Sequence, residues 1–563
     1  MENPGAGLRG EGREQEEGNT QANRWFDRKI TSAIEEQQSV HQNKSVAVPR
    51  KRWEVRQLST MATEEGLLQM VSVALLAALL VLVLIHVLIH VFPAAGSSAL
   101  KAPPGPFPLP IIGNLHQLDL KRPYRSLMQL SKKYGSVFTI HLGPRKVVVL
   151  AGYETVKDVL INHAEEFGDR DMLPVFYDSS EGHGVLFANG ESWKEMRRFS
   201  LSNMRDFGMG RKGSEEKIME EMNYLSEVFE QQGGKPFDVK DPVNRAVSNI
   251  ISSIVYGTRF DYDDPVFQAM VNKANERVSL SMSPQMQLYN AFPFLGFLLR
   301  DRRAFRNIVK ENLANIRGFV RELQMSLNVN DKRGLIDSFL IRQQQESGQE
   351  GSHFHELNLI HIVSNLFVAG TDTTSTTLRW GLLLMAKYPH IQEKVQEEIS
   401  RVIGGRPPRV EDRKGMAYTD AVIHEVQRFA NILPLNLPHA TSCDVHFQGY
   451  FIRKGTPVWP FLTSVLQDET QWETPHQFNP GHFLDSEGKL LKRDAFMPFS
   501  AGPRACLGES LARMELFLFF TSLLQRFTFT PPPGTAVSEL DLTPDVGFIT
   551  NPMPHQLCAV SRA

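Results

Sequence analysis

The sequence predicts a predominantly α-helical fold with small β-sheets, preceded by one N-terminal transmembrane helix. Long stretches with helical apolar periodicity dominate the chain, short β-branched runs interrupt them, and one long apolar run lies near the N-terminus. The chain has 563 residues, 42% of them hydrophobic, and a formal net charge of −2. These values are typical of globular proteins, and they agree equally with several domains and with one large fold carrying a membrane appendage.

Residues 1–65 are rich in Glu, Gln, Asn, Arg and Gly, and they contain too few apolar residues to build a core. We expect a disordered leader that reflects an alternative start, at Met61, or a gene-model extension. With the leader, the basic residues within 50–56 would hold the N-terminus in the cytosol. A chain that starts at Met61 would place its N-terminus in the lumen and the remainder in the cytosol, and we expect this second orientation.

Residues 66–92 are the expected transmembrane anchor. Between 71 and 92 only one serine and two histidines interrupt the apolar residues. At about 1.5 Å per helical residue this run crosses a hydrocarbon core of ~30 Å. A cleavable signal peptide is the alternative, but its apolar region is typically only ~7 to 15 residues long. We therefore expect a retained anchor.

Residues 93–115 are the expected hinge between the anchor and the main domain, 116–563. The segment APPGPFPLPIIGNL at 102–115 is too rich in proline for a helix, so it should form a stiff connection.

The main domain should begin with a small sheet and continue mainly as helices. The β-branched runs 137–142 and 146–150 are joined across Gly143-Pro144, which predicts a hairpin. Helical periodicity recurs, between Pro and Gly clusters, at 215–231, 243–256, 303–327, 357–388 and 418–433.

The fourth of these helices, taken as Glu356–Lys387, carries an unusual polar segment. It is apolar along most of its length, yet its middle reads AGTDTT at 369–374. A glycine within a helix costs roughly 1 kcal/mol relative to alanine, and threonine and aspartate compete for backbone hydrogen bonds. The segment therefore indicates either a functional site or a kink that merely bends the helix.

The three cysteines, Cys443, Cys506 and Cys558, are too few and too scattered for a disulfide framework, which favours a reducing compartment. Long Lys/Arg runs are absent from the sequence, so nothing indicates nucleic-acid binding.

The segment FSAGPRACLG at 499–508 is the strongest candidate for a cofactor site. Cys506 precedes an apolar helix whose dipole and free N–H groups would stabilise a thiolate. Gly502 and Gly508 would let the backbone approach a bulky flat cofactor, and Arg504 offers a fork of donors to a carboxylate. Taken alone, however, such a cysteine is more often a small buried apolar residue than a metal ligand.

At every constrained position this segment resembles the haem-binding signature of the cytochrome P-450 superfamily, Phe-x-x-Gly-x-Arg-x-Cys-x-Gly. From about Met61 to its C-terminus, the chain resembles the microsomal family 2 type of that superfamily. The resemblance implies the fold of that superfamily, haem b (iron protoporphyrin IX) as cofactor and Cys506 as the metal ligand. Two propionates would be costly to bury without cationic partners. The residues that the resemblance assigns to the cofactor are Phe499, Gly502, Arg504, Cys506, Gly508, Arg170, Trp193, Arg197 and His439.

The resemblance also identifies the AGTDTT segment as the oxygen-activating part of the helix that crosses the distal face of the haem. Ala369 and Gly370 would let the helix approach the porphyrin, Thr373 would hydrogen-bond the bound dioxygen or its water, and Asp372 would help to relay protons.

The pair Glu425 and Arg428, three residues apart, is weak on its own, because exposed pairs with this spacing are common and contribute only ~0.2 to 0.5 kcal/mol. The resemblance makes it a buried structural ion pair that joins a downstream loop near Phe483. His482 occupies a loop position where the family commonly has arginine, which leaves the third member of this polar network open.

The resemblance therefore implies an NADPH-dependent monooxygenase that inserts one oxygen atom from O2 into lipophilic organic substrates such as xenobiotics, fatty acids or steroids. Electrons would come through a separate flavoprotein reductase, because the chain has no visible flavin or nicotinamide motif. The implied location is the endoplasmic reticulum membrane, with a single pass, lipid contact and a cytosolic catalytic domain. The alternatives are a peroxide-rearranging isomerase of the same fold, which Thr373 disfavours, and a non-catalytic haem-binding membrane protein.

Two surfaces carry further expectations. Basic residues around Lys194, Arg198 and Arg513 would form a docking surface for an acidic electron donor, or simply an ordinary solvated helix face. The segment AFPFLGFLL at 291–299 resembles the substrate-entry loop that dips into the bilayer, although core packing explains it nearly as well.

Overall fold

The computed structural model of the protein describes residues 67–78, 80–81, 101–207 and 212–562. The chain divides into two units, Met1–Phe92 and Pro93–Ala563. In the first unit, residues 67–78 and 80–81 are helical, and apolar side chains such as Leu75 and Leu76 are exposed. Within the described part of the chain, no helix combines the length and the apolar character that a membrane crossing requires. Residues 66, 79 and 82–92 of the expected anchor, residues 93–100 of the expected hinge and the whole expected leader, 1–65, lie outside the described residues.

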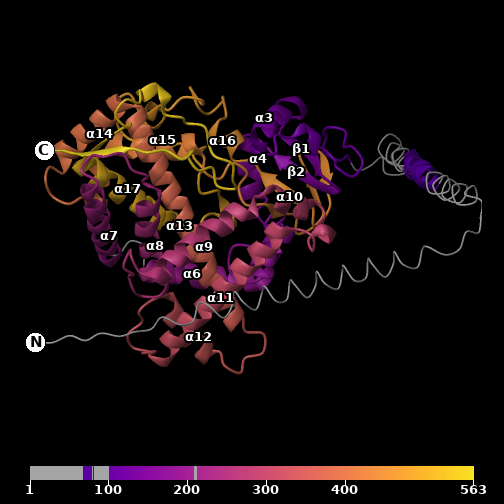
Figure 1. Ribbon diagram of the computed structural model, residues 1–563, viewed down its shortest axis with the longest axis horizontal. Coiled ribbons are helices and arrows are strands. Elements are labelled where there is room, and N and C mark those ends of the chain that lie inside the picture. Colours follow the sequence, from indigo (N-terminus) through magenta and orange to yellow (C-terminus); the bar gives the residue numbers. More distant parts are fainter. Residues whose placement is uncertain (1–66, 79, 82–100, 208–211, 563) are drawn as a thin grey trace, which may run out of the picture. The chain divides into compact units, whose positions relative to one another are not determined.

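The second unit is built mainly from α-helices (Figure 1). They are α3 (Pro123–Tyr134), α4 (Tyr153–Lys157), α5 (Pro174–Ser180), α6 (Gly190–Phe207), α7 (Lys212–Gln231), α8 (Lys240–Val255), α9 (Pro265–Ser281), α10 (Pro284–Ala291), α11 (Arg300–Met325), α12 (Leu335–Gln345), α13 (Glu356–Lys387), α14 (Pro389–Val402), α15 (Ala417–Ala430), α16 (Thr463–Leu466) and α17 (Glu509–Arg526). Shorter helical turns are η1 (Leu115–Gln117), η2 (Asp158–Asn162), η3 (Pro293–Leu295), η4 (Val410–Gly415), η5 (Pro480–Phe483), η6 (Gly502–Arg504) and η7 (Val537–Glu539).

The predicted helical stretches are confirmed as α7, α8, α11, α13 and α15, with ends that differ by a few residues. At its C-terminal end, α15 stops at Ala430 instead of residue 433. Asn431 adopts a left-handed conformation with φ of 40°, which closes the helix, and Pro434 follows shortly after.

Short strands complete the fold and bring distant residues together. They are β1 (Val137–Leu142), β2 (Arg145–Leu150), β3 (Asp169–Arg170), β4 (His439–Ala440), β5 (Val445–Phe447), β6 (Tyr450–Ile452), β7 (Pro457–Pro460), β8 (Phe527–Thr530) and β9 (Cys558–Ser561). The largest sheet has the order β1-β2-β7-β4-β3. Its antiparallel β1–β2 pair, in register from Val137 opposite Leu150, confirms the predicted hairpin. At its other edge, β3 and β4 place Arg170 opposite His439.

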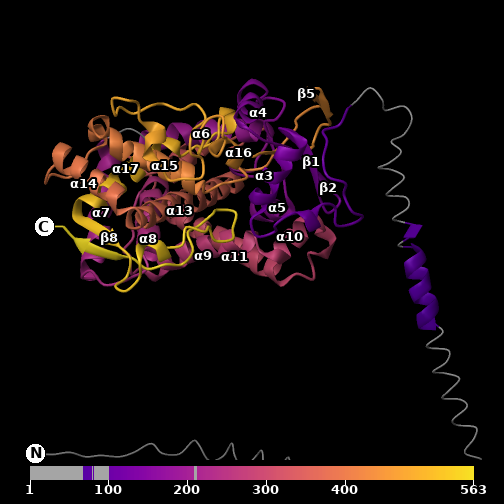
Figure 2. The same ribbon diagram turned by 90° about the horizontal axis from the view of Figure 1, so that it is seen from above.

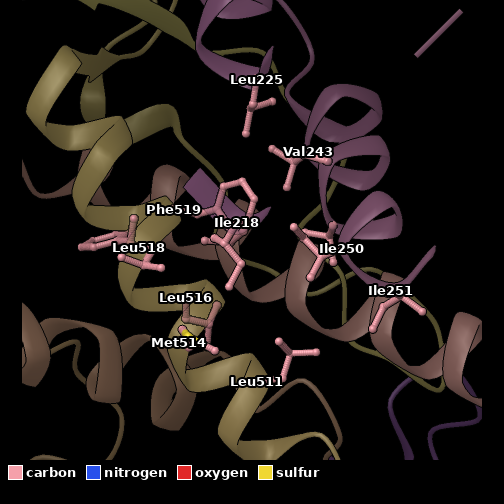
Figure 3. Close-up of a cluster of buried hydrophobic side chains, with 14 of the residues drawn as sticks. Ile218, Leu225, Val243, Ile250, Ile251, Leu511, Met514, Leu516, Leu518 and Phe519 are labelled. Carbon is pink, nitrogen blue, oxygen red and sulfur yellow. The ribbon is translucent and has the colours of Figure 1, made fainter. Parts of the chain in front are cut away.

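Helix α13 lies in the middle of the second unit in both views (Figures 1 and 2) and packs against α8, α9, α11, α15 and α17. The β1–β2 hairpin and α3 lie toward one end of this unit, and α7, α14 and α17 lie toward the other. Figure 3 shows part of the core, in which side chains of α7, α8 and α17 meet. The labelled residues are Ile218, Leu225, Val243, Ile250, Ile251, Leu511, Met514, Leu516, Leu518 and Phe519. This apolar packing holds α17, and therefore the loop that precedes it, against the rest of the fold.

The polar segment of α13 does not interrupt the helix, which is continuous from Glu356 to Lys387. One threonine of this segment and one just after it donate their hydroxyl groups to the backbone of the preceding turn. Thr373 Oγ1 donates to the carbonyl of Ala369 at 2.7 Å, and Thr377 Oγ1 donates to the carbonyl of Thr373 at 2.9 Å. These bonds satisfy polar groups that would otherwise be costly inside an apolar helix.

Candidate functional site

Cys506 lies in the loop directly before α17, as the sequence predicts. Its backbone N–H donates to the carbonyl of Phe499 at 2.9 Å, which closes the loop on itself. The exposed surface of Cys506 faces an internal cavity, so the surrounding protein still desolvates the thiol. This burial raises the pKa of Cys506, whereas the backbone N–H groups of Gly508 and Glu509 and the positive charge of Arg197 lower it.

Gly502 is required by the fold of this loop. It adopts a φ of +73°, and a Cβ atom there would lie 1.8 Å from the carbonyl oxygen of Leu160 in η2. The close approach expected from the sequence is therefore made to another part of the backbone. Gly508, in contrast, has open space where a Cβ would stand.

The cavity, with about 1240 Å³ of space free of protein atoms when its solvent-open part is included, is bounded by α13, the Cys506 loop and α6. Most of the sequence-assigned site residues line it: Arg170, Trp193, Arg197, Ala369, Gly370, Thr373, Phe499, Arg504, Cys506 and Gly508. Asp372, His439 and Gly502 do not line it. Much of the remaining wall is apolar, with side chains such as Val185, Leu366 and Leu433. The structure thus brings together residues that lie more than three hundred positions apart in the sequence.

One side of the cavity carries a cluster of buried cations. Arg504 donates from Nε to the carbonyl of Gly168 at 2.8 Å, and its guanidinium carbon lies 3.4 Å from the ring centroid of Trp193. Arg197 donates to the carbonyl of Ala505 at 2.7 Å. Burial and the neighbouring charge of Arg197 lower the pKa of Arg170 to about 9. Burial and the charge of Arg170 lower the pKa of Arg504 to about 8.

This cluster fits a dianionic cofactor such as haem b. Among the described residues, no carboxylate forms an ion pair with Arg170, Arg197 or Arg504, and their described hydrogen bonds go to neutral oxygen atoms. Trp193 Nε1 and His439 Nε2 are buried without a hydrogen-bond partner. His439 Nδ1 bonds to the carbonyl of Phe167 at 2.7 Å, and burial together with the charge of Arg170 lowers the His439 pKa. Two propionates would supply the missing negative charge and acceptors.

The polar segment of α13 presents its residues to different sides. Ala369, Gly370 and Thr373 face the cavity, and a Cβ atom on Gly370 would lie 2.4 Å from Cδ1 of Ile251 in α8, so the glycine permits close packing of the two helices. Asp372 is buried away from the cavity wall. Burial raises its pKa to about 6, although the charge of Arg379 lowers it.

Glu515, a buried carboxyl of α17 that also lines the cavity, was not predicted as a site residue from the sequence. Burial raises its pKa to about 8, opposed by a hydrogen bond to Thr374 of α13, and its Oε1 has no partner among the described residues. A charged residue within the apolar run LARMELFLFF was the available signal.

Away from the cavity, Glu425 and Arg428 form the expected ion pair. Both side chains are fully buried, and Arg428 donates from Nε and Nη2 to the two carboxylate oxygens, each at 2.7 Å. Arg428 Nη1 also reaches the carbonyl of Pro475 in the downstream loop at 2.8 Å. His482 Nδ1 lies 3.2 Å from a carboxylate oxygen of Glu425, so the histidine takes the third place in this network.

The structure describes residues of both expected surfaces, the basic docking surface and the loop at 291–299. Lys194 and Arg198 on α6 are exposed, and Arg513 bonds to Glu509 at 2.9 Å. The loop around η3 exposes Phe294 and Phe297, with 71% and 72% of their surface accessible.

Comparison with known proteins agrees with this geometry. The family model described as Cytochrome P450 matches residues 103–559. Cytochrome P450 2K1 of Oncorhynchus mykiss is 63% identical over 464 residues, which cover 82% of this chain and 92% of that protein. Cytochrome P450 2K4 of the same organism is 60% identical, covering 89% and 100%, and Cytochrome P450 2F2 of Mus musculus is 48% identical, covering 81% and 93%. With a cysteine-bearing cavity and a cationic cluster that fit the cofactor, the chain belongs to the cytochrome P450 family of haem-thiolate monooxygenases, which bind haem b through a cysteine thiolate.

Proposed function

We propose that this monooxygenase inserts one oxygen atom of O2 into lipophilic organic substrates inside the cavity, with Cys506 as the ligand of the haem iron. The observation that carries the proposal is the position of Cys506 and Thr373 on the walls of one largely apolar cavity. A cavity of this size and lining favours binding of apolar molecules by exclusion of water.

Cys506 would hold the iron through its thiolate. The N–H groups at the start of α17 and the nearby charge of Arg197 favour the ionised sulfur. When bound, the haem supplies an iron centre that activates O2, and a thiolate ligand increases the electron density that favours O–O cleavage.

Arg170, Arg197, Arg504, Trp193 and His439 would bind the haem propionates. The buried, unbalanced charges of the arginines and the unpaired ring nitrogens of Trp193 and His439 support this role. Charge-assisted hydrogen bonds from guanidinium groups would also fix the orientation of the macrocycle.

Thr373 would position a proton near the site of oxygen activation. Its hydroxyl donates to the carbonyl of Ala369 and keeps acceptor capacity toward the cavity. Asp372, with its pKa raised to about 6, would take up and release a proton at a pH slightly below neutral. Asp372 does not line the cavity, so it would not contact the substrate directly. Protons from Asp372 would have to reach the cavity through other groups around α13.

We also propose that electrons arrive from NADPH through a separate flavoprotein reductase, and that residues 66–92 anchor the protein in the endoplasmic reticulum membrane with a cytosolic catalytic domain. The exposed basic residues Lys194 and Arg198 lie on α6 beside Trp193 of the cationic cluster, which supports docking of an acidic partner there. The exposed aromatic side chains of Phe294 and Phe297 support contact of their loop with lipid.

The test is turnover by the full-length holoenzyme in lipid vesicles with NADPH, reductase, a neutral lipophilic probe and isotopically labelled O2. The proposal predicts substrate-dependent NADPH consumption and one labelled oxygen atom in the product. Product that carries oxygen from water would contradict it. Conversion of an organic hydroperoxide without NADPH, in the absence of oxygenation, would support the isomerase alternative instead.

A further inference from the structure

An open groove separate from the haem cavity runs along one face of α11. It contains about 1370 Å³ of space free of protein atoms when its solvent-open part is included, and none of its lining residues lines the haem cavity. One wall carries Arg303, Arg306 and Lys310, which lie three and four positions apart and therefore share one face of α11. The residue after α5, Glu181, and the loop before α11, through Phe297, also line the groove.

The wall formed by α11 carries unbalanced positive charge. Arg303, Arg306 and Lys310 are exposed, and among the described residues no carboxylate lies within ion-pair distance of any of them. The neighbouring Glu311 is paired with Lys273 of α9 at 2.8 Å. Like charges on one helix face repel each other and destabilise the helix. An anion in the groove would remove this repulsion.

The other charged residues of the groove do not cancel the charge of these three cations. Arg302 is paired with Asp178 of α5 at 2.8 Å, and Arg317 is paired with a glutamate of α13 at 3.2 Å. Burial lowers the pKa of His361 to about 4, so this residue is neutral at physiological pH. Glu181 is exposed and forms no ion pair with a described residue. One carboxylate therefore shares the groove with three unpaired cations.

An exposed apolar loop borders the cations. Phe297 lines the groove with 72% of its surface accessible, and its neighbours Phe294 and Leu298 are 71% and 63% accessible. Leu299 and Leu313 extend the apolar part of the groove wall. Exposed aromatic and aliphatic side chains beside cations match a ligand that joins hydrocarbon to negative charge.

We propose that this groove binds an anionic phospholipid, with the phosphate at Arg303, Arg306 and Lys310 and the acyl chains beside Phe297. A guanidinium group offers paired donors to a phosphate, and the lysine adds a point charge. Inorganic phosphate shares the headgroup chemistry but would leave the apolar loop exposed, so the lipid matches both parts of the groove. The inference rests on the proposed association with the membrane, and it adds the class of lipid and the residues that select it.

The test uses the full-length holoenzyme in nanodiscs of phosphatidylcholine that contain a trace of photoactivatable lipid. Two probes with the same acyl chains and a photoreactive group beside the glycerol are compared, phosphatidate and phosphatidylcholine. The crosslinked lipid on residues 299–313, which include the groove wall of α11, is measured by mass spectrometry. Each basic residue near an anionic lipid contributes roughly a fivefold preference. We therefore expect phosphatidate to label this segment at least about tenfold more than phosphatidylcholine.

Three variants locate the preference. Arg306→Gln should lower the phosphatidate label about fivefold. Combining it with Arg303→Gln and Lys310→Gln should lower the label to the level of phosphatidylcholine. The matched control is Arg321→Gln, which removes an exposed arginine of the same helix that does not line the groove, and it should change neither label. The Soret spectrum of each variant confirms that it binds haem.

Equal labelling by the two probes in the wild type, or a preference that the triple variant retains, would overturn the lipid site. Excess inorganic phosphate should leave most of the phosphatidate label in place, and complete loss of the label would overturn the proposal in favour of a free-phosphate site. Complete loss of the label on adding equimolar reductase would likewise identify an acidic protein as the occupant.

Failure of the membrane association is distinguishable from failure of the lipid site. A holoenzyme that does not elute with the nanodiscs would reject the association and the lipid site together. Elution with the nanodiscs and equal labelling by the two probes would reject the lipid site alone.

Discussion

Replacing Glu425 by glutamine should destabilise the fold strongly, because it removes the charge that balances Arg428. Both side chains are fully buried and are joined by two hydrogen bonds of 2.7 Å. The other acceptors of Arg428 are the neutral carbonyls of Leu466, Pro475 and Gln477, which cannot replace a carboxylate. Leaving one charge of a buried pair without its partner costs about 3–5 kcal/mol. At 1.4 kcal/mol per tenfold, this lowers the folding equilibrium constant by roughly two to three and a half powers of ten.

The assay is urea unfolding of the full-length holoenzyme, followed in parallel by far-UV circular dichroism and by Soret absorption. The matched control is Glu191→Gln, which removes an exposed partner of Lys194 at the same spacing of three residues. Exposed pairs of this kind contribute little to stability, so the control should unfold like the wild type. A Glu425→Gln variant as stable as the Glu191→Gln control would show that the buried ion pair does not stabilise the fold.

Three further predictions concern the cavity and its loop. Thr373→Ala should retain haem but divert reducing equivalents to hydrogen peroxide, measured as peroxide formed per NADPH consumed; unchanged coupling would count against its role in proton delivery. Gly502→Ala should reduce haem incorporation and the midpoint of thermal unfolding, because its Cβ would meet the Leu160 carbonyl at 1.8 Å in a backbone conformation with φ of +73°; wild-type values for both would contradict the clash. Burial raises the pKa of Glu515 from its ordinary 4.5 to about 8, so the folded state retains a proton that the unfolded chain releases. The stability that this protonated carboxyl contributes is complete below pH 4.5 and is lost as the pH rises through about 8. The free energy of unfolding of Glu515→Gln should therefore increase relative to that of the wild type from pH ~5 to ~8. A difference that does not change with pH would exclude a raised pKa for Glu515.

Local patterns predicted much of this molecule. The apolar periodicity of α13 and α15 and the β-branched runs of the β1–β2 hairpin are properties of neighbouring residues, and the structure confirms all three elements. The loop around Cys506 could be predicted for a similar reason, since turn, cysteine and helix start are contiguous.

The remaining features depend on contacts between distant segments. The space beside Gly502 is taken by Leu160, and that beside Gly370 by Ile251, and neither neighbour is visible from the local sequence. Helical spacing alone does not show which side of α13 faces the cavity. Both Asp372 and Thr373 were therefore predicted to act in oxygen activation, although only Thr373 lines the cavity. Glu515 was overlooked because the apolar run around it indicates core packing.

The reduced carbon-monoxide difference spectrum of the purified full-length protein shows whether the Cys506 thiolate binds the haem iron. We expect a Soret band at the thiolate-specific position for the wild type and for Cys443→Ser, a control at an exposed cysteine, and loss of that band in Cys506→Ser. An unchanged band in Cys506→Ser, or a wild-type protein that binds no haem, would contradict the assignment of Cys506 as the iron ligand.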